Sequence, residues 1–176
     1  MAGVEVDRQA PTFQRLRGTD GEVYSLSSFA DARILVVVFV ANGCPTVRAL
    51  EPWFVDFQRA YRARAVRLVW INSNNASLSP PDTFEEMVRR TAASGLAFPY
   101  LEDGDGQVGR AFGALTTPHA FVLDEQRQVR YHGRVADSRQ ASTVTLPYVQ
   151  LAVEDLLAGR EVAVPETEPY GCAIVW

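Results

Sequence analysis

Cys44 is the residue of this sequence best placed to do chemistry, because of the two segments that meet at it. Residues 34–41 form an apolar run rich in β-branched side chains, which is typical of a buried strand. Gly43 ends the run, and Pro45 suits the first turn of a helix, where its missing N–H leaves no hydrogen bond unmade. A thiol at this junction lies beside unpaired N–H groups and the positive end of the helix dipole. We therefore predict that Cys44 is a reactive cysteine with a lowered pKa.

The two histidines give weaker signals. His119 directly follows Pro118 and could lie near the thiol and tune it, although its strand context also fits an ordinary, partly buried histidine. His132 is predicted to lie at the surface.

No set of side chains has the spacing of a metal site. Asp103 and Asp105 lie in a glycine-rich turn that lacks the rest of an EF-hand loop, and we interpret them as turn formers. The remaining possible ligands also lack ligand spacing: Cys44, His119, His132 and Cys172. We therefore predict no bound metal ion and no cofactor.

Composition narrows the class of protein. The 176 residues suit one domain, residues 1–176, and the formal charge of -4 with dispersed arginines argues against nucleic acid as a partner. The sequence contains no lysine, which excludes lysine Schiff-base chemistry and a P-loop lysine. The chain shows no signal peptide and no run long enough to span a membrane, and its two distant cysteines fit a reducing compartment. We expect a cytoplasmic protein with no membrane partner.

Hydrophobic periodicity and turn residues predict the elements that position Cys44. Strands alternate with helices and end in a hairpin, which predicts an α/β fold with a central mixed sheet flanked by helices. The first expected elements are an N-terminal β-hairpin around residues 18–22, a central strand from about residue 33, a helix over 44–63 kinked at Pro52, and a strand over 66–72. A helix from about 84 to 95, a short strand over 98–101 and a short helix over 108–115 follow. The chain is then expected to form a hairpin of 119–124 with 129–133, a last helix over 145–157 capped by Gly159, and an extended C-terminal tail over 160–176.

This order of elements, with a cysteine at the start of the first long helix and Thr117-Pro118 before the last hairpin, resembles the thioredoxin-like superfamily. Three N-terminal segments resemble the hairpin of its peroxiredoxin and redoxin branch: Ala10-Pro-x-Phe13, Asp20-Gly21 and Ser25-Leu26. Phe39 to Arg48, with Pro52, resembles the active-site strand and kinked helix of membrane-tethered thiol-disulfide reductases. The resemblance implies a thioredoxin-like fold with Pro118 as a cis-proline beside the active-site sulfur.

Nearly the whole chain also resembles a bacterial peroxiredoxin-like group that carries Asn-His-Cys-Pro-Tyr-Val and ends in Gly-Cys-Ser-Ile-Lys-Trp. The equivalent segments here are Asn42–Val47 and Gly171–Trp176. Gly43 replaces the histidine of the group, so proton transfer at Cys44 needs another residue or water. In line with this resemblance, we expect the residues that shape the active site to be Asn42, Gly43, Pro45, Thr117 and Pro118.

The neighbours of Cys44 restrict its chemistry. A CxxC dithiol needs a second cysteine at Val47, so ordinary thioredoxin cycling at this site is excluded. A peroxiredoxin needs Pro-x-x-x-Thr-x-x-Cys, in which the threonine orients the peroxide. The corresponding positions here are Val37 and Ala41, which argues against efficient peroxidase activity.

The redox route that is left uses both cysteines. In it, Cys44 attacks a disulfide or is oxidised to a sulfenic acid, and Cys172 resolves the product. About thirteen residues separate Gly159 from Cys172, and extended chain covers roughly 3.3 Å per residue, so the tail is long enough to reach back. Residues 173–176 would anchor it by burying apolar surface, with Trp176 worth about 2 kcal/mol when covered. A buried tail strand without a redox role is the alternative for Cys172.

We therefore expect a thiol-dependent oxidoreductase that performs disulfide exchange or hydroperoxide reduction, with Cys44 as the nucleophilic thiolate and Cys172 as the candidate resolving thiol. Its expected partner is a protein or small molecule that carries a thiol or disulfide, and the chain itself could be a monomer or a homodimer. One alternative is a non-redox thioredoxin-like module that binds a peptide or protein in the groove around Pro118. A further alternative is a slow peroxidase in which water or backbone N–H groups replace the missing threonine.

Overall fold

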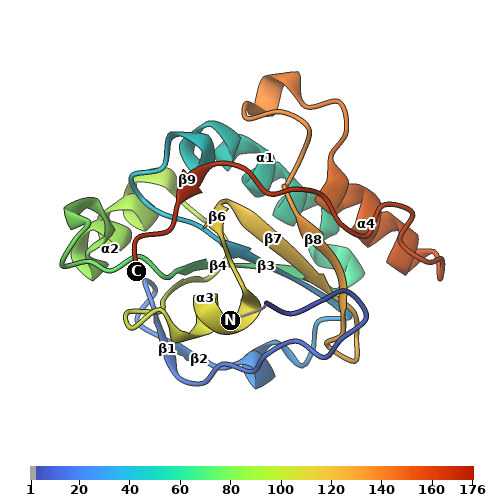
Figure 1. Ribbon diagram of the computed structural model, residues 1–176, viewed down its shortest axis with the longest axis horizontal. Helices are drawn as coiled ribbons and strands as arrows, with labels where there is room; N and C mark the ends of the chain where they lie inside the picture. Colours follow the sequence, from blue (N-terminus) through green and yellow to red (C-terminus); the bar gives the residue numbers. More distant parts are fainter. Residues whose placement is uncertain (1–2) are drawn as a thin grey trace.

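The computed structural model describes residues 3–176 and is built around a seven-stranded mixed sheet of strand order β2-β1-β5-β4-β3-β7-β8 (Figure 1). Its strands are β1 (Leu16–Gly18), β2 (Val23–Tyr24), β3 (Ile34–Phe39), β4 (Val66–Asn72), β5 (Tyr100–Glu102), β7 (His119–Leu123) and β8 (Val129–Gly133), and a separate two-stranded sheet joins β6 (Thr116–Thr117) to β9 (Cys172–Ala173). The helices are α1 (Pro45–Tyr61), α2 (Phe84–Ser94), α3 (Gln107–Phe112) and α4 (Tyr148–Leu157). None of these helices combines the length and apolar character that crossing a bilayer requires. The expected mixed sheet flanked by helices is confirmed.

Strand β3 lies in the interior of the sheet, between β4 and β7, and all six of its residues are apolar and buried. It pairs in parallel with β4, so that Val37 lies opposite Val69, and antiparallel with β7, so that Val37 also lies opposite Phe121. The parallel pair needs a crossover, which α1 supplies. The carboxyl end of β3 therefore leads directly to the start of α1.

Side chains alternate along β3 between two cores. Val36 and Val38 belong to a cluster with buried residues of α1, α2 and α4, which we call the α1 face. Val37 and Phe39 belong to a second cluster with α3 and the N-terminal segment, which we call the α3 face. A strand covered on both sides has no polar alternation, which explains the uninterrupted apolar run in the sequence. Cys44 belongs to the α1 face.

Helix α1 presents its apolar stripe to the sheet. Leu50, Phe54 and Phe57 are buried at helical spacing, and Phe54 contacts the Trp70 ring edge-to-face at 5.3 Å. The helix ends at Tyr61 and continues as a short 3-10 turn to Arg64, close to the expected end. Pro52 lies inside the helix, and the kink expected there stays a prediction.

The N-terminal hairpin of β1 and β2 is present, and it extends the main sheet because β1 also pairs antiparallel with β5. Three predicted boundaries were wrong by two or three residues. Strand β5 begins at Tyr100, and α3 ends at Phe112 because Gly113 adopts a left-handed conformation with φ +76°. Helix α4 begins at Tyr148 because Pro147 is its N-cap, and Ala158 rather than Gly159 is its C-cap.

The C-terminal tail runs from the end of α4 across the molecule to β9 (Figure 1). It first follows the free edge of β8, where the His132 N–H donates to the Pro165 carbonyl at 3.1 Å and the Thr167 N–H donates to the His132 carbonyl at 3.2 Å. It then forms β9 against β6. Its extended course is confirmed.

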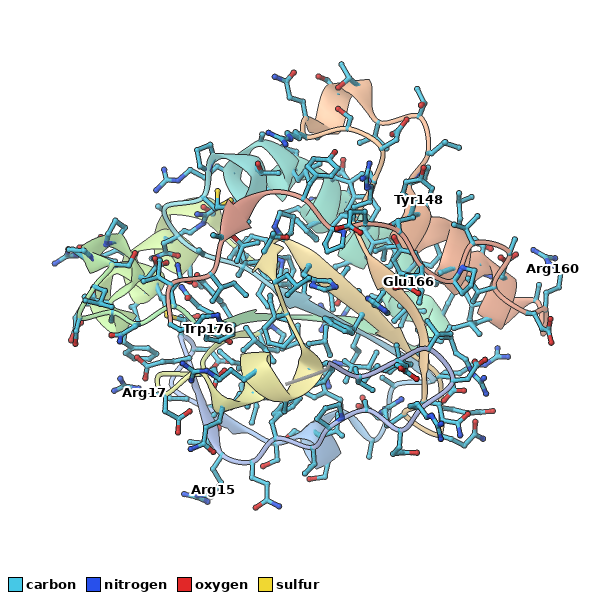
Figure 2. The ribbon with its side chains drawn as sticks, in the orientation of Figure 1. Arg15, Arg17, Tyr148, Arg160, Glu166 and Trp176 are labelled. Atoms are coloured by element: carbon cyan, nitrogen blue, oxygen red, sulfur yellow. The ribbon has the colours of Figure 1, made fainter. Side chains whose placement is uncertain are left out.

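Apolar contacts anchor the end of the tail, as expected for residues 173–176, although Trp176 is covered only in part. Ile174 is the buried apolar residue of this segment, whereas Trp176 stays 39% exposed. Its ring lies over the Arg110 guanidinium, 4.6 Å away, and packs beside Gly106 and Gly109. Figure 2 labels Trp176 at this end of the tail and Glu166 nearer its start.

Replacement of Phe54 tests how far the α1 face stabilises the fold. We expect Phe54→Ala to lower the free energy of unfolding by about 3–5 kcal/mol, because it removes a fully buried ring and leaves a cavity. Urea unfolding measures this change. Asp56→Ala, at an exposed position of the same helix, is the control and is expected to change it by less than about 0.5 kcal/mol.

Candidate active site

Cys44 lies between the end of β3 and the start of α1, as the N-cap residue that precedes Pro45. The residue is only 2% exposed, and its Sγ donates a hydrogen bond to the Thr117 carbonyl at 3.2 Å. The Thr117-Pro118 peptide is cis. The structure thus brings Thr117 and Pro118 beside the thiol, at the place that the resemblance implied.

Cys172 reaches the same place from the far end of the chain. In the antiparallel pair of β6 and β9, Cys172 lies opposite Thr117 and Ala173 lies opposite Thr116. Gly171 makes this close approach possible: its φ is +151°, and a Cβ atom there would lie 2.0 Å from the Thr117 carbonyl oxygen. Both cysteines are free thiols in this structure.

The surroundings of Cys44 favour its thiolate. Burial by itself raises the pKa of Cys44, but hydrogen bonds outweigh it and hold that pKa below its usual value. The donors are the side chains of Cys172 and Thr117 and the backbone N–H groups of Val47 and Cys172. The Val47 N–H belongs to the first turn of α1, as expected for a thiol at a helix start. Within residues 3–176 the buried Thr117 hydroxyl has no partner while Cys44 is protonated, so it is free to donate to the thiolate.

Cys172 is shifted in the opposite direction. Burial, the hydrogen bond to Cys44 and the charge of the Cys44 thiolate raise the pKa of Cys172 to about 11. One shared hydrogen bond therefore lowers the pKa of Cys44 and raises that of Cys172. Cys44 is the thiol of the pair that ionises first.

The residues before Cys44 are fixed by polar contacts. Asn42 is buried, its backbone N–H donates to Asp82 at 2.7 Å, and its side-chain oxygen accepts from the Tyr100 hydroxyl at 2.6 Å. Gly43 is exposed, and a Cβ atom there would meet Pro81 only at an ordinary 3.5 Å, so a side chain fits at this position. The peroxiredoxin-like group that this chain resembles has a histidine here, so lack of space does not explain why this chain has glycine instead.

Several of these supporting side chains were missed at the sequence level. The Asn42 carbonyl accepts hydrogen bonds from Arg48 Nε and Arg90 Nη1, both at 2.9 Å, and Arg90 also pairs with Glu51 at 2.9 Å. Asp82, which no sequence pattern singled out, is also buried. One signal pointed there: Asn42 follows the carboxyl end of β3 and Asn72 is the last residue of β4, and these adjacent parallel strands end at the same edge of the sheet.

The suggestion that His119 tunes Cys44 is not supported. The His119 ring stacks on Phe121 at 4.5 Å, and Phe121 packs on the α3 face of the sheet, whereas Cys44 lies on the α1 face. His132 was also placed wrongly, because it is partly buried and its Nδ1 lies 3.3 Å from Nε2 of His119. Its Nε2 in turn lies 3.4 Å from the Glu166 carboxylate on the tail.

Both histidines resist protonation. Burial, with a smaller effect of His132, lowers the pKa of His119 to about 3. Burial also lowers the pKa of His132, against the opposing effect of the Glu166 charge. The Leu115 N–H donates to Nδ1 of His119, which leaves the ring proton on Nε2, toward His132. The pair is therefore neutral and joins two strands to the tail.

Asp103, interpreted as a turn former, is buried and supports the start of α3. Its carboxylate accepts from the Ser73 hydroxyl at 2.7 Å and from the N–H groups of Val108 and Gly109. Burial raises the pKa of Asp103, and these hydrogen bonds oppose the shift. The loop is held by protein donors.

With this geometry established, comparison with known proteins identifies the family. Residues 5–146 match the family model described as Redoxin. The chain belongs to the redoxin family. A curated relative, the sporulation thiol-disulfide oxidoreductase A of Bacillus subtilis (strain 168), is 25% identical over 119 residues, which cover 68% of this chain and 68% of the relative.

Two solved structures share the fold of this chain. A hypothetical protein of Sinorhizobium meliloti 1021 is 32% identical with a TM-score of 0.91, and the match covers 99% of this chain and 96% of that one. A putative thiol:disulfide interchange protein DsbE of Chlorobium tepidum is 22% identical with a TM-score of 0.68, covering 89% of this chain and 98% of that one. The redoxin is thus confirmed to have a thioredoxin-like fold.

The lowered pKa of His119 predicts a loss of stability in acid. Above pH 6.5 the histidine is neutral in the folded and unfolded states, so it has no effect on their balance. Between pH 6.5 and about 3 only the unfolded state binds the proton, which destabilises the redoxin by up to about 1.4 kcal/mol per pH unit. We expect the free energy of unfolding of His119→Asn, measured by urea at several pH values, to fall less steeply there than that of the wild type. Equal slopes would contradict the assignment.

Gly171 provides a test of the β6–β9 pairing. We expect Gly171→Ala to displace β9, because the new Cβ atom would overlap the Thr117 carbonyl, while the main sheet stays folded. The measurement is the yield of the Cys44–Cys172 disulfide after mild oxidation, by peptide mapping, which should fall at least about tenfold. Gly95→Ala, at a positive-φ glycine with open space around it, is the control for backbone strain alone. An unchanged yield in Gly171→Ala would show that the tail does not depend on this contact.

Proposed function

We propose that this redoxin is a thiol-disulfide oxidoreductase in which Cys44 is the nucleophile and Cys172 the resolving thiol. The observation that carries the proposal is the β6–β9 pairing, which sets Cys172 opposite Thr117 while the Cys44 Sγ donates to the carbonyl of the same threonine. The name of the B. subtilis relative supports the same reaction class. Membership of the redoxin family agrees with it.

The two pKa shifts assign the roles. A thiolate is the attacking species in disulfide exchange, and Cys44 is the thiol that ionises more readily. Cys172, with its pKa raised to about 11, stays protonated and donates to the Cys44 thiolate until that charge has been used. Formation of a mixed disulfide removes the charge and with it one cause of the raised pKa.

The reaction balances over two exchanges. The Cys44 thiolate attacks one sulfur of a substrate disulfide, forms a mixed disulfide and releases the other substrate sulfur as a thiolate, which takes up a proton. Cys172 then loses its proton and attacks the Cys44 sulfur, which forms the Cys44–Cys172 disulfide and releases the second substrate thiol. The substrate is reduced by two electrons and the protein is oxidised by two. An external dithiol returns both cysteines to the reduced state.

Access to Cys44 requires the tail to shift. The residue is 2% exposed, so a substrate sulfur reaches it only after β9 moves aside. Strand β9 consists of two residues, and few backbone hydrogen bonds hold it. Local displacement of so short a strand needs little free energy compared with unfolding.

We propose the cytoplasm as the location of this protein, because external dithiols that would reduce the two cysteines are present there.

A matched set of Cys172 variants tests the roles of both thiols. With oxidised glutathione, the wild type is expected to form the Cys44–Cys172 disulfide, whereas Cys172→Ser stops at a glutathione mixed disulfide on Cys44. Cys172→Ala is expected to raise the pH midpoint of Cys44 alkylation by iodoacetamide more than Cys172→Ser, because serine keeps a hydroxyl donor. Mass spectrometry of mapped peptides and the alkylation pH profile are the measurements.

Two results separate this proposal from its alternatives. Activity of Cys44→Ser in peptide binding, with no disulfide formed by the wild type, would favour the non-redox binding module. Faster oxidation of Cys44 by hydrogen peroxide than by disulfides would favour a peroxidase. Either result would overturn the proposal.

A further inference from the structure

Asp82 is a buried carboxylate, 4% exposed, with hydrogen bonds to both of its oxygens. Oδ1 accepts from the Asn42 backbone N–H at 2.7 Å and from Asn72 Nδ2 at 2.9 Å. Oδ2 accepts from Asn74 Nδ2 at 3.0 Å and from the Ser79 hydroxyl at 2.5 Å. We call these five residues the Asp82 cluster. A carboxylate accepts hydrogen bonds only, so it specifies a donor at each of the four contacts.

One branch of the cluster leads to Cys44. The Asn42 peptide N–H points at Asp82, and the carbonyl of the same residue accepts from Arg48 and Arg90. Asn42 precedes Cys44 by two residues. The backbone of Asn42 is therefore fixed at its N–H by an acceptor and at its carbonyl by two cationic donors.

The other branch leads to Cys172. Asn74 uses its side-chain amide in two directions: Nδ2 donates to Asp82, and Oδ1 accepts from the Val175 backbone N–H at 2.9 Å. The Asn75 N–H donates to the Val175 carbonyl at 2.7 Å. Val175 follows Cys172 by three residues. Because Asp82 accepts only, it holds the Asn74 amide with its oxygen toward the tail.

We propose that Asp82 is a positioning residue that sets the separation and direction of the two redox thiols. The inference rests on the proposed function, because it assumes that Cys44 and Cys172 form a disulfide. Exchange requires the attacking sulfur to lie in line with the breaking bond, so a small displacement of either thiol slows it strongly. Asp82 hydrogen-bonds directly to the segment of Cys44 and reaches the segment of Cys172 through Asn74. Within residues 3–176 it hydrogen-bonds to neither sulfur, so it acts through their backbones.

The effective concentration of Cys172 toward Cys44 is the quantity that tests this role. It is obtained from the equilibrium of the full chain with reduced and oxidised glutathione, and the mixed disulfide on Cys44 is quantified at the same time. Asp82→Asn replaces one carboxylate oxygen by an NH2 group. That donor then faces the two donors which the oxygen had accepted from. We expect the effective concentration to fall roughly 10- to 100-fold, with accumulation of the mixed disulfide.

Asn74→Ala is the milder second variant, because it breaks only the tail branch and leaves Asn42 bonded to Asp82. We expect it to lower the effective concentration as well, while the rate at which glutathione disulfide first attacks Cys44, at equal thiolate fraction, does not fall, because a looser tail uncovers the thiol. This split distinguishes positioning from a general loss of stability.

Gln58→Leu is the matched control. Gln58 is also buried, 6% exposed, and bonds the backbone of Val66 and Leu68 at 3.1 and 2.7 Å, near the other end of α1. It should lower the melting temperature without changing the effective concentration. If Asp82→Asn and Asn74→Ala behave like Gln58→Leu, the positioning role is overturned while the two-cysteine mechanism stands. If the wild type forms no Cys44–Cys172 disulfide, the proposed function itself fails, and the positioning role with it.

Discussion

The antiparallel pairing of β6 with β9 is the contact on which the site depends. It brings the two cysteines, which lie far apart in the sequence, to the same threonine. Backbone pairing of this kind does not depend on most side chains, but it requires the two strands to approach closely. Gly171 meets that demand because only a residue without Cβ fits against the Thr117 carbonyl. The tail is held at further points, along β8 and at Asn74 and Asn75, so β9 can be short and still be in register.

The same proximity gives the two thiols different properties. Cys44 accepts hydrogen bonds from the helix start and from the tail, which lower its pKa. Cys172 donates a hydrogen bond to Cys44 and lies near the negative charge of the Cys44 thiolate, which raise its pKa. The pair therefore has a built-in order of ionisation although both residues are cysteines. Cys44 can ionise without a histidine at position 43, because hydrogen-bond donors rather than a neighbouring base stabilise its thiolate.

The central sheet divides the polar groups of the protein by face. The α1 face holds Cys44, and the α3 face holds the stacked ring of His119 next to Phe121. The side chains of successive strand residues point to opposite faces of the sheet. His119 directly follows Pro118 in the sequence, but its side chain points to the α3 face and therefore away from the thiol. The His119–His132 pair instead connects the hairpin to Glu166 of the tail, which makes it part of the structure that holds the tail in place.

By itself the sequence determined the elements and the place of Cys44 between two of them. An apolar β-branched run, a glycine and a proline are local signals, and they located β3, the start of α1 and Cys44 between them, because strand burial and helix initiation depend on neighbouring residues. Only the tertiary structure decided which groups meet Cys44. The tail was long enough to reach many places, and the choice of β6 depends on Gly171 and on contacts between residues far apart in the sequence. The Asp82 cluster and the position of His119 were likewise undecided, since strand order and side-chain direction arise from the packed sheet rather than from any local pattern.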